Sequence, residues 1–314
     1  MAIPFSIMWY NTENFYDVIN DPDILDDEYT PKGALHWTKE RFNAKLEHLS
    51  KVIKDIVLPD FPDIIGLAEI ENRGVMNSVA EKLRHERIGN YETVHYESPD
   101  ERGADIGVLY NPHTFQVIES KPILVKLPGI EDRTRDILYI KGRVRNEILH
   151  FFFTHFPSRR EGLDRSERRR YFVASELENA VQNVLTIEPD AQIIISGDFN
   201  DTPDNNSVDE ILGAKKEFVN IEKQSLYNLL YPRHKRGIGT TYHKQWLLFD
   251  QFLVTGSLLS STKIQCKPEN ADVFNPPYLI HFEKHRHFPN RTYSGKYVGG
   301  YSDHLPIYLK MYLL

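Results

Sequence analysis

One stretch decides the fold: Ile193-Ile194-Ile195-Ser196-Gly197-Asp198-Phe199-Asn200. Three consecutive β-branched residues predict a buried strand, and the glycine after them predicts a turn. The turn delivers a carboxylate, Asp198, and two residues later an amide, Asn200. A carboxylate held by a neighbouring amide can orient and deprotonate a water molecule. The same residues could also do no more than cap a turn, so this stretch alone leaves both interpretations open.

Other apolar, β-branched runs bounded by polar or turn residues predict further strands. These runs are Phe5–Tyr10, Asp63–Ala68, Thr93–Tyr96, Ile106–Tyr110, Ile137–Val144, Ile148–Thr154, Gln192–Ser196, Phe249–Val254 and Leu305–Met311. Apolar residues at helical spacing predict helices between them. The helices run from a Thr38 N-cap to a stop at Pro59, from Gly74 to His85, and from about Arg165 to Leu185.

The order of these elements predicts an α/β layered sandwich in a single domain, residues 1–314. Strands come in groups of two or three with helices at intervals, which departs from the strict alternation of a parallel sheet. No Pro/Gly/Ser-rich linker divides the chain. If two covered sheets pack face to face, their strand ends form one rim where loops meet. The polar residues of interest lie at such strand ends.

Two further strand ends carry side chains suited to phosphate chemistry. Glu69 follows an apolar run, where a buried carboxylate is costly unless it meets a cation, and such an oxygen ligand suits Mg²⁺ better than zinc. His155 ends another run, and Arg159 and Arg160 follow it, which suits phosphate oxygens that gain charge. A solvent-exposed acid, and a core histidine before a solvated basic loop, are the competing interpretations.

The segment Ser302-Asp303-His304 precedes the last predicted strand. An adjacent Asp and His can supply a metal or water contact and an imidazole near one phosphate, although an isolated pair is more often a surface feature. Asp250 begins a late strand and could fix the tautomer of His304, or it is an ordinary strand-edge acid. Asn11 ends the first predicted strand.

Taken in order, these motifs resemble the endonuclease/exonuclease/phosphatase superfamily, which includes DNase I-like nucleases, inositol-phosphate phosphatases and neutral sphingomyelinases. The resemblance covers nearly the whole chain, through Asn11, Glu69, His155, Asp198 with Asn200, Asp250, and Asp303 with His304. Ala68 stands where family members often carry glutamine. The stretches at 11–17 and 155–160 look like those of a bacterial branch of the superfamily.

The resemblance implies a four-layer α/β/β/α sandwich with two central mixed, mainly antiparallel sheets and the site at their top. It implies a Mg²⁺ cofactor, with Mn²⁺ as an alternative, bound by Glu69, Asn11 and Asp303. The ion would neutralise developing charge and position the phosphate for in-line attack.

The resemblance also implies the catalytic roles. Asp198 would orient or activate water, with Asn200 beside it. His155 and His304 would hydrogen-bond the scissile phosphate, and Asp250 would support His304.

The long connections near the predicted site are expected to form its rim. Because long loops beside a site often hold substrate, we expect substrate contacts from Arg291 and Tyr293, together with Arg159 and Arg160. An acidic segment from Asp17 to Glu28 does not fit a calcium-binding EF-hand loop and is expected to be a solvated loop. A solvated loop is also expected around His281, Glu283, His285 and His287.

Composition limits the remaining choices. Among 314 residues, 40% are hydrophobic and 26% charged, which is typical of a globular protein. Cys266 is the only cysteine, so no intramolecular disulfide can form. No apolar run is long enough to span a membrane and the N-terminus lacks a signal-peptide pattern, so we expect a cytoplasmic protein. A net charge of -7 argues against non-specific binding of long nucleic acid.

These observations predict a divalent-metal-dependent phosphoesterase, most simply a phosphodiesterase or a nuclease acting on a small or structured nucleic acid. One alternative is a phosphomonoesterase that acts on a phosphorylated sugar, inositol or lipid head group. Another is a binding protein that keeps the fold without turnover. The phosphate ester is the expected partner, and the sequence implies no obligate protein partner.

Overall fold

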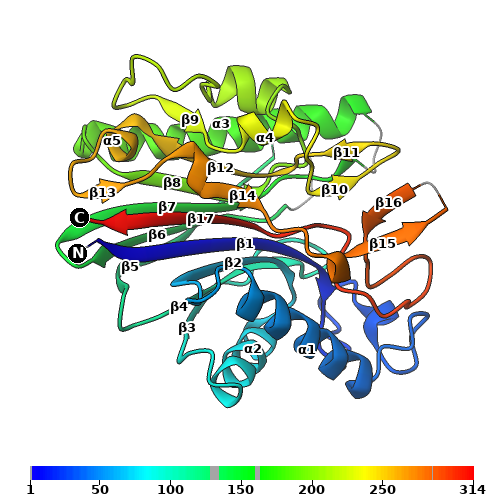
Figure 1. Cartoon of the computed structure of the whole chain (residues 1–314). Helices are drawn as coiled ribbons and strands as arrows, with labels where there is room; N and C mark the ends of the chain where they lie inside the picture. The colour runs from blue at the N-terminus through cyan, green and yellow to red at the C-terminus, as the bar shows by residue number, and fades with distance from the viewer. Residues whose placement is uncertain (1, 128–133, 160–162, 285) are drawn as a thin grey trace.

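The computed structural model describes residues 2–127, 134–159, 163–284 and 286–314. Two mixed sheets lie at the centre of the molecule, with helices on their outer sides (Figure 1). The first sheet has the strand order β13-β17-β1-β2-β4-β3, with β14 also paired to β17. The second has the order β5-β6-β7-β8-β12-β9.

The strands of the first sheet are β1 (Ile3–Phe15), β2 (Ile64–Ile70), β3 (Glu92–His95), β4 (Asp105–Tyr110), β13 (Ile264–Gln265), β14 (Ala271–Val273) and β17 (Ile307–Leu313). Those of the second are β5 (Gln116–Ile123), β6 (Ile137–Val144), β7 (Glu147–His155), β8 (Ile193–Asp198), β9 (Leu226–Asn228) and β12 (Asp250–Thr255). Two small pairs lie outside them, β10 (Thr241–Tyr242) with β11 (Trp246–Leu247) and β15 (Ile280–Glu283) with β16 (Arg286–Pro289).

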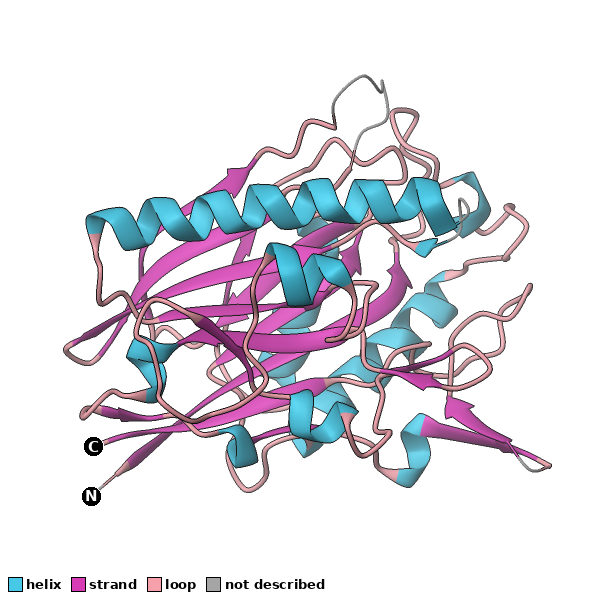
Figure 2. Cartoon of the chain, turned by 90° about the horizontal axis from the view of Figure 1, so that it is seen from above, coloured by secondary structure: helices cyan, strands magenta, loops and turns pink. Residues whose placement is uncertain are grey.

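Helices cover both sheets. α1 (Lys39–Asp55) and α2 (Arg73–His85) lie on the first sheet, while α3 (Leu163–Ile187) lies across the second, as the view from above shows (Figure 2). The buried face of α3, with Val173, Leu177 and Val181, packs against Phe152 and Ile193 of the second sheet. Two single-turn helices, α4 (Tyr231–His234) and α5 (Gly256–Leu259), complete the chain with short 3-10 and π turns. The predicted fold class is confirmed.

The inner faces of the two sheets form the main core. Trp9 of β1 stacks on Phe153 of β7, with ring centroids 6.2 Å apart, and both side chains are buried. Burying aromatic side chains of this size contributes several kcal/mol. The contact also sets β1 and β7 across from each other, so that the loops at their ends share one rim.

Each sheet contains a single parallel pair among otherwise antiparallel neighbours, and these two pairs place the site. β1 and β2 are parallel and joined through α1; β7 and β8 are parallel and joined through α3. The carboxyl ends of parallel strands meet at the same edge of a sheet. Register pairs Asn11 with Ala68 in the first sheet and His155 with Asp198 in the second.

The structure confirms the predicted strands and helices within a few residues and corrects three expectations. β1 does not end at Asn11 but continues to Phe15 after a break in register with β2. β5 was not expected, because its exposed and half-buried side chains lack an apolar pattern. The segment around His281 and His287 is the β15–β16 hairpin rather than a loop, with His285 outside the described residues. No helix in the described chain is long and apolar enough to cross a bilayer.

Candidate active site

Asp198, at the end of β8, lies at the centre of a group of polar side chains from both sheets. Its Oδ2 atom is 3.1 Å from Asn11 Nδ2, 3.5 Å from His155 Nε2 and 3.7 Å from His304 Nε2. We call Asn11, Glu69, His155, Asp198, Asp250 and His304 the central cluster. Five of these residues lie in the strands β1, β2, β7, β8 and β12, and His304 lies in the segment before β17. The fold thus brings together residues that are up to 293 positions apart in the sequence.

In the turn after β8, Asn200 holds the Asp198 carboxylate through its main chain and anchors the turn to Phe156 through its side chain. The Asn200 main-chain N–H donates to Asp198 Oδ1 at 2.8 Å, and its side-chain amide donates to the Phe156 carbonyl at 2.9 Å. Asn200 adopts a left-handed backbone with a φ of 49°, which asparagine tolerates better than most residues. Gly197 is required just before Asp198, because a Cβ there would lie 2.3 Å from the Thr154 carbonyl oxygen.

Glu69 faces Asp198 from the opposite sheet. Its Oε1 atom is 3.4 Å from Asn11 Nδ2 and 3.9 Å from His155 Nε2, and its Oε2 atom accepts a 2.8 Å bond from the Asn14 N–H. Asn11 therefore donates to both acids through one amide nitrogen. Its Oδ1 atom accepts from the Glu13 N–H at 2.9 Å, so the amide is held at both ends.

Backbone strain aims the Glu69 side chain. Glu69 has a φ of 60°, and the register of β2 against β4 shifts between Ala68 and Ile70, so Glu69 sits on a β-bulge. A glutamate in the left-handed region costs on the order of 1–3 kcal/mol, and such residues gather at functional sites. Glu13 and Asn14, beside it on β1, share this backbone conformation. The bulge turns one side chain of an otherwise buried strand toward the rim.

His304 is fixed by a carboxylate on its far side. Its Nδ1 atom is 2.6 Å from Asp250 Oδ2, while the other Asp250 oxygen accepts a 2.9 Å bond from Trp9 Nε1. Both oxygens of this fully buried acid are thus occupied, and Asp250 is positioned to orient His304 rather than to bind an ion. The Ser302 hydroxyl donates to the Asn11 carbonyl at 2.6 Å and ties this segment to β1.

The two histidines of the central cluster differ in charge. Burial, together with the positive charges of Arg102 and His304, lowers the pKa of His155 well below its ordinary value. Burial would also lower the pKa of His304, but the Asp250 and Asp198 carboxylates outweigh it and raise that pKa well above its ordinary value. Burial raises the pKa of Asp198 to about 7, opposed by the His304 charge. Near neutral pH the cluster therefore pairs a neutral and a charged imidazole.

Asp303 is placed at the edge of this group. Its Oδ2 atom pairs with Arg291 Nη2 at 3.2 Å. Among the described residues, it makes no hydrogen bond or ion pair with Glu69 or Asp198. Asp303 and Arg291 line a cavity of about 190 Å³ together with Tyr242, Glu283, Arg286, Phe288 and Pro289. A role for Asp303 in binding the metal thus stays a prediction, and its observed surroundings are those of a rim residue.

Arg159 is hydrogen-bonded to the turn after β8, and its predicted substrate contact stays a prediction. Its guanidinium donates to the Asn200 carbonyl at 2.8 Å, and to Asp201 Oδ1 and Asn205 Oδ1 at 2.7 and 3.0 Å. Arg170 pairs with the other Asp201 oxygen at 2.8 Å. Arg159 therefore supports the turn that carries Asp198. Arg160 lies outside the described residues.

Tyr293 is buried, with only 8% of its surface exposed, where a substrate contact was expected. Its ring packs among Tyr29, Trp37 and Tyr297, and its hydroxyl donates to the Asn14 carbonyl at 3.4 Å. The loop folds back because aromatic side chains near α1 offer it an apolar surface. The predicted substrate contact of Tyr293 stays a prediction.

Sequence reasoning missed Arg102, which precedes β4. Burial would lower the pKa of its guanidinium, but the nearby carboxylates of Glu69 and Asp100 raise it. β4 runs antiparallel to β2, so the residues before β4 lie at the same rim as Glu69. That antiparallel pairing was the signal that could have identified Arg102. It adds positive charge beside the central cluster.

The central cluster is a candidate metal site, since ligand atoms of Asp198, Asp250 and His304 all lie within 4.8 Å of one another. Glu69 and Asp198 bring carboxylate oxygens from opposing sheets toward one amide, and oxygen ligands are those that Mg²⁺ prefers. Asn11 presents its nitrogen to both acids, so in this arrangement it positions them instead of offering an oxygen ligand. His155 Nδ1 is buried and has no hydrogen-bond partner in the described structure.

Comparisons with known proteins agree with the fold of this chain. Among solved structures, a Bacteroides vulgatus endonuclease/exonuclease/phosphatase is similar with a TM-score of 0.59 and 15% identity, over 99% of this chain and 100% of that one. D. rerio TDP2 complexed with single strand DNA product has the same score and identity, over 98% of each chain. The human Nocturnin catalytic domain with bound sulfate has a TM-score of 0.57 and 15% identity, over 99% and 95%.

Sequence relatives extend the same pattern. Protein angel of Drosophila melanogaster is 18% identical over 226 residues, which are 71% of this chain and 60% of that protein. Bacterial and animal structures are similar to the same degree, so assignment to a bacterial branch stays a prediction. The model of the Endonuclease/Exonuclease/phosphatase family matches residues 6–312. The chain belongs to the Endonuclease/Exonuclease/phosphatase family.

Proposed function

We propose that this protein hydrolyses phosphate esters with the help of a divalent cation, by attack of water on the phosphorus. One observation carries the proposal: the Asp198 carboxylate is buried between an amide and two imidazoles that come from both sheets. Burying a carboxylate without a full countercharge is costly, and such arrangements are typical of catalytic centres. Nothing in the core packing requires it.

Asp198 is the proposed general base. The Asn200 N–H holds Oδ1, and Oδ2, which accepts from the Asn11 amide, would take a proton from water through its other lone pair. His304, held charged by Asp250, would donate from Nε2 to a phosphate oxygen that gains negative charge. His155, kept neutral, would donate a second hydrogen bond from the other side. Asn11 would position the Asp198 and Glu69 carboxylates, which come from opposing sheets, by donating to both.

Mg²⁺ is the proposed cofactor, with Mn²⁺ as an alternative, and Glu69 is its principal ligand. When bound, the ion would neutralise charge on the phosphate oxygens. Asp303 and Asn11 are proposed as further ligands; in this structure Asp303 Oδ2 pairs with Arg291, and Asn11 Oδ1 accepts from the Glu13 N–H.

A phosphodiester is the proposed substrate class. The cavity beside Asp303 is lined by two arginines, Arg286 and Arg291, and by the rings of Tyr242 and Phe288, together with Glu283 and Pro289. A second substituent on the phosphate needs such room, and paired charge and ring surfaces suit a nucleotide. The similar TDP2 structure is a complex with single strand DNA product, which supports a nucleic-acid substrate for this chain.

Side-by-side assays test the substrate class. We expect a diester reporter to be hydrolysed in Mg²⁺ faster than the corresponding monoester, and EDTA to stop both reactions. A strong preference for the monoester would replace the diesterase proposal with a phosphomonoesterase acting on a sugar, inositol or lipid phosphate. Absence of turnover on either, with Mg²⁺ still bound, would favour a binding protein.

Arg286→Gln should raise the KM for a diester by roughly tenfold, because a hydrogen bond to a charged group contributes about 1.5–3 kcal/mol. The KM for a small monoester, which does not reach the cavity, should change little. Arg143→Gln is the matched control, since Arg143 is exposed and lies near the end of β6 that is farther from His155. Equal effects of Arg286→Gln on both substrates would show that the cavity does not hold the second substituent.

A further inference from the structure

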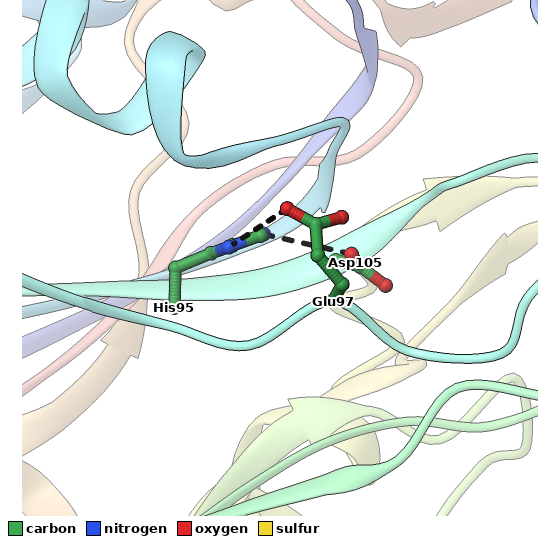
Figure 3. Close-up of side chains that lie close together, drawn as sticks. All are labelled: His95, Glu97 and Asp105. Atoms are coloured by element: carbon green, nitrogen blue, oxygen red, sulfur yellow. Dashed lines mark ion pairs between the residues drawn. The ribbon is translucent and has the colours of Figure 1, made fainter. Parts of the chain in front are cut away.

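A second group of metal-ligating side chains lies outside the central cluster. His95 ends β3, Asp105 begins β4, and Glu97 stands in the loop between them. Figure 3 shows the imidazole facing both carboxyl groups. One ligand atom from each of the three residues lies within 4.8 Å of the others. We call these three residues the His95 cluster.

Two buried atoms of the His95 cluster lack hydrogen bonds. His95 Nε2 and Asp105 Oδ2 have no hydrogen-bond partner within the described part of the chain, and both side chains are 1% exposed. They lie 3.5 Å apart, which is too long for a good N–H···O bond. Buried polar atoms are almost always paired, so two unpaired atoms facing each other indicate a missing partner between them.

The spacing suits a metal ion. Two ligands of a tetrahedral zinc, each at 2.0–2.1 Å, are about 3.3 Å apart. The Nε2–Oδ2 separation is close to that value. The other Asp105 oxygen already accepts from the Ser98 N–H at 3.1 Å and from the Ser98 hydroxyl, so the free oxygen is held in a fixed direction. Glu97 has a 67% exposed side chain and can close on an ion from the solvent side.

The surrounding charge is mixed but favours a cation. Arg73 lies nearby and donates to the His95 carbonyl at 3.1 Å. Against this single positive charge stand the Glu97 and Asp105 carboxyls and Asp21, whose charge acts on Glu97. One imidazole with two carboxylates suits a transition dication, whereas Mg²⁺ prefers oxygen ligands alone.

We infer that His95, Glu97 and Asp105 bind a Zn²⁺-class dication, with solvent completing its coordination. The site joins the two ends of the loop at residues 96–104. This loop contains Arg102, which lies at the rim beside Glu69. The bound ion would stabilise this loop and thereby hold Arg102. The inference does not depend on the proposed catalytic activity.

Calorimetric titration of the EDTA-treated full chain with Zn²⁺, in excess Mg²⁺, tests the site. We expect one binding event that His95→Gln abolishes and that Glu97→Gln weakens by roughly tenfold or more. Asp105→Asn, which keeps an acceptor for Ser98, should also abolish it. His113→Gln, at an exposed histidine, and Glu69→Gln in the central cluster should leave the event unchanged.

Glu97→Gln keeps the test decisive if the buried variants do not fold, because Glu97 is largely exposed. Zn²⁺ binding that is equal in wild type and Glu97→Gln, or that survives His95→Gln in a folded protein, would overturn the inference. So would a wild-type chain whose only Zn²⁺ binding disappears in Glu69→Gln.

Discussion

Asp198→Asn is expected to lower the metal-dependent hydrolysis of a phosphate ester by roughly 10²–10⁴-fold, the usual contribution of a general base. Asparagine has nearly the same shape and can still accept from the Asn200 N–H, but it cannot take a proton from water. The measurement is kcat with saturating Mg²⁺ and substrate. Since the effect falls on the chemical step, KM should change much less than kcat.

Asp190→Asn is the matched control for Asp198→Asn. Asp190 lies on the surface and pairs with the exposed Lys223, so this variant should keep wild-type activity. Circular dichroism should show both variants folded. If Asp198→Asn retains more than about a tenth of the wild-type kcat, Asp198 is not the general base.

Lys45→Met is expected to cost roughly 3–5 kcal/mol of unfolding free energy, the usual result of breaking a buried charged network. Lys45 of α1 is buried, and its Nζ donates to the Glu13 carbonyl at 3.0 Å, to Thr292 Oγ1 at 2.7 Å and to the Tyr301 carbonyl at 3.4 Å. It thereby joins α1 and β1 to the segment that leads to His304. Methionine leaves all three acceptors without this donor.

Urea unfolding measures the effect of Lys45→Met, with Lys54→Met as control because Lys54 is exposed on the same helix. Glu13 is buried beside Lys45. Burial lowers the pKa of Lys45, and the negative charge of Glu13 acts in the opposite direction and raises it. Adding Glu13→Gln should therefore recover part of the lost stability, as expected for coupled sites. A loss no larger than that of Lys54→Met would refute the structural role of this network.

Much of the site was predictable because its residues lie at strand ends. Apolar runs identify strands, and a polar residue after such a run falls at an edge of the sheet. His155 and Asp198 follow this rule, and the parallel register places them side by side. The layered fold followed from the grouping of strands and from the resemblance carried by the ordered motifs.

What escaped prediction depends on long-range contacts and local strain. The bulge and positive φ at Glu69 have no pattern in the sequence, since glutamate usually avoids that conformation. The bond from Arg159 to Asp201 was not predicted, because it depends on a turn that places a buried acid beside the guanidinium. Tyr293 turns inward because α1 and β1 offer it a partly apolar pocket, which the order of residues does not show.

Restoration of activity by Mg²⁺ tests the central proposal most directly. EDTA-treated wild-type protein should regain hydrolysis of a phosphodiester reporter as Mg²⁺ is added. Glu69→Gln should show little or no recovery, whereas Glu81→Gln, at an exposed position on α2, should recover like wild type. Equal recovery in Glu69→Gln and wild type, or hydrolysis that persists in EDTA, would contradict a metal-dependent centre built on Glu69 and Asp198.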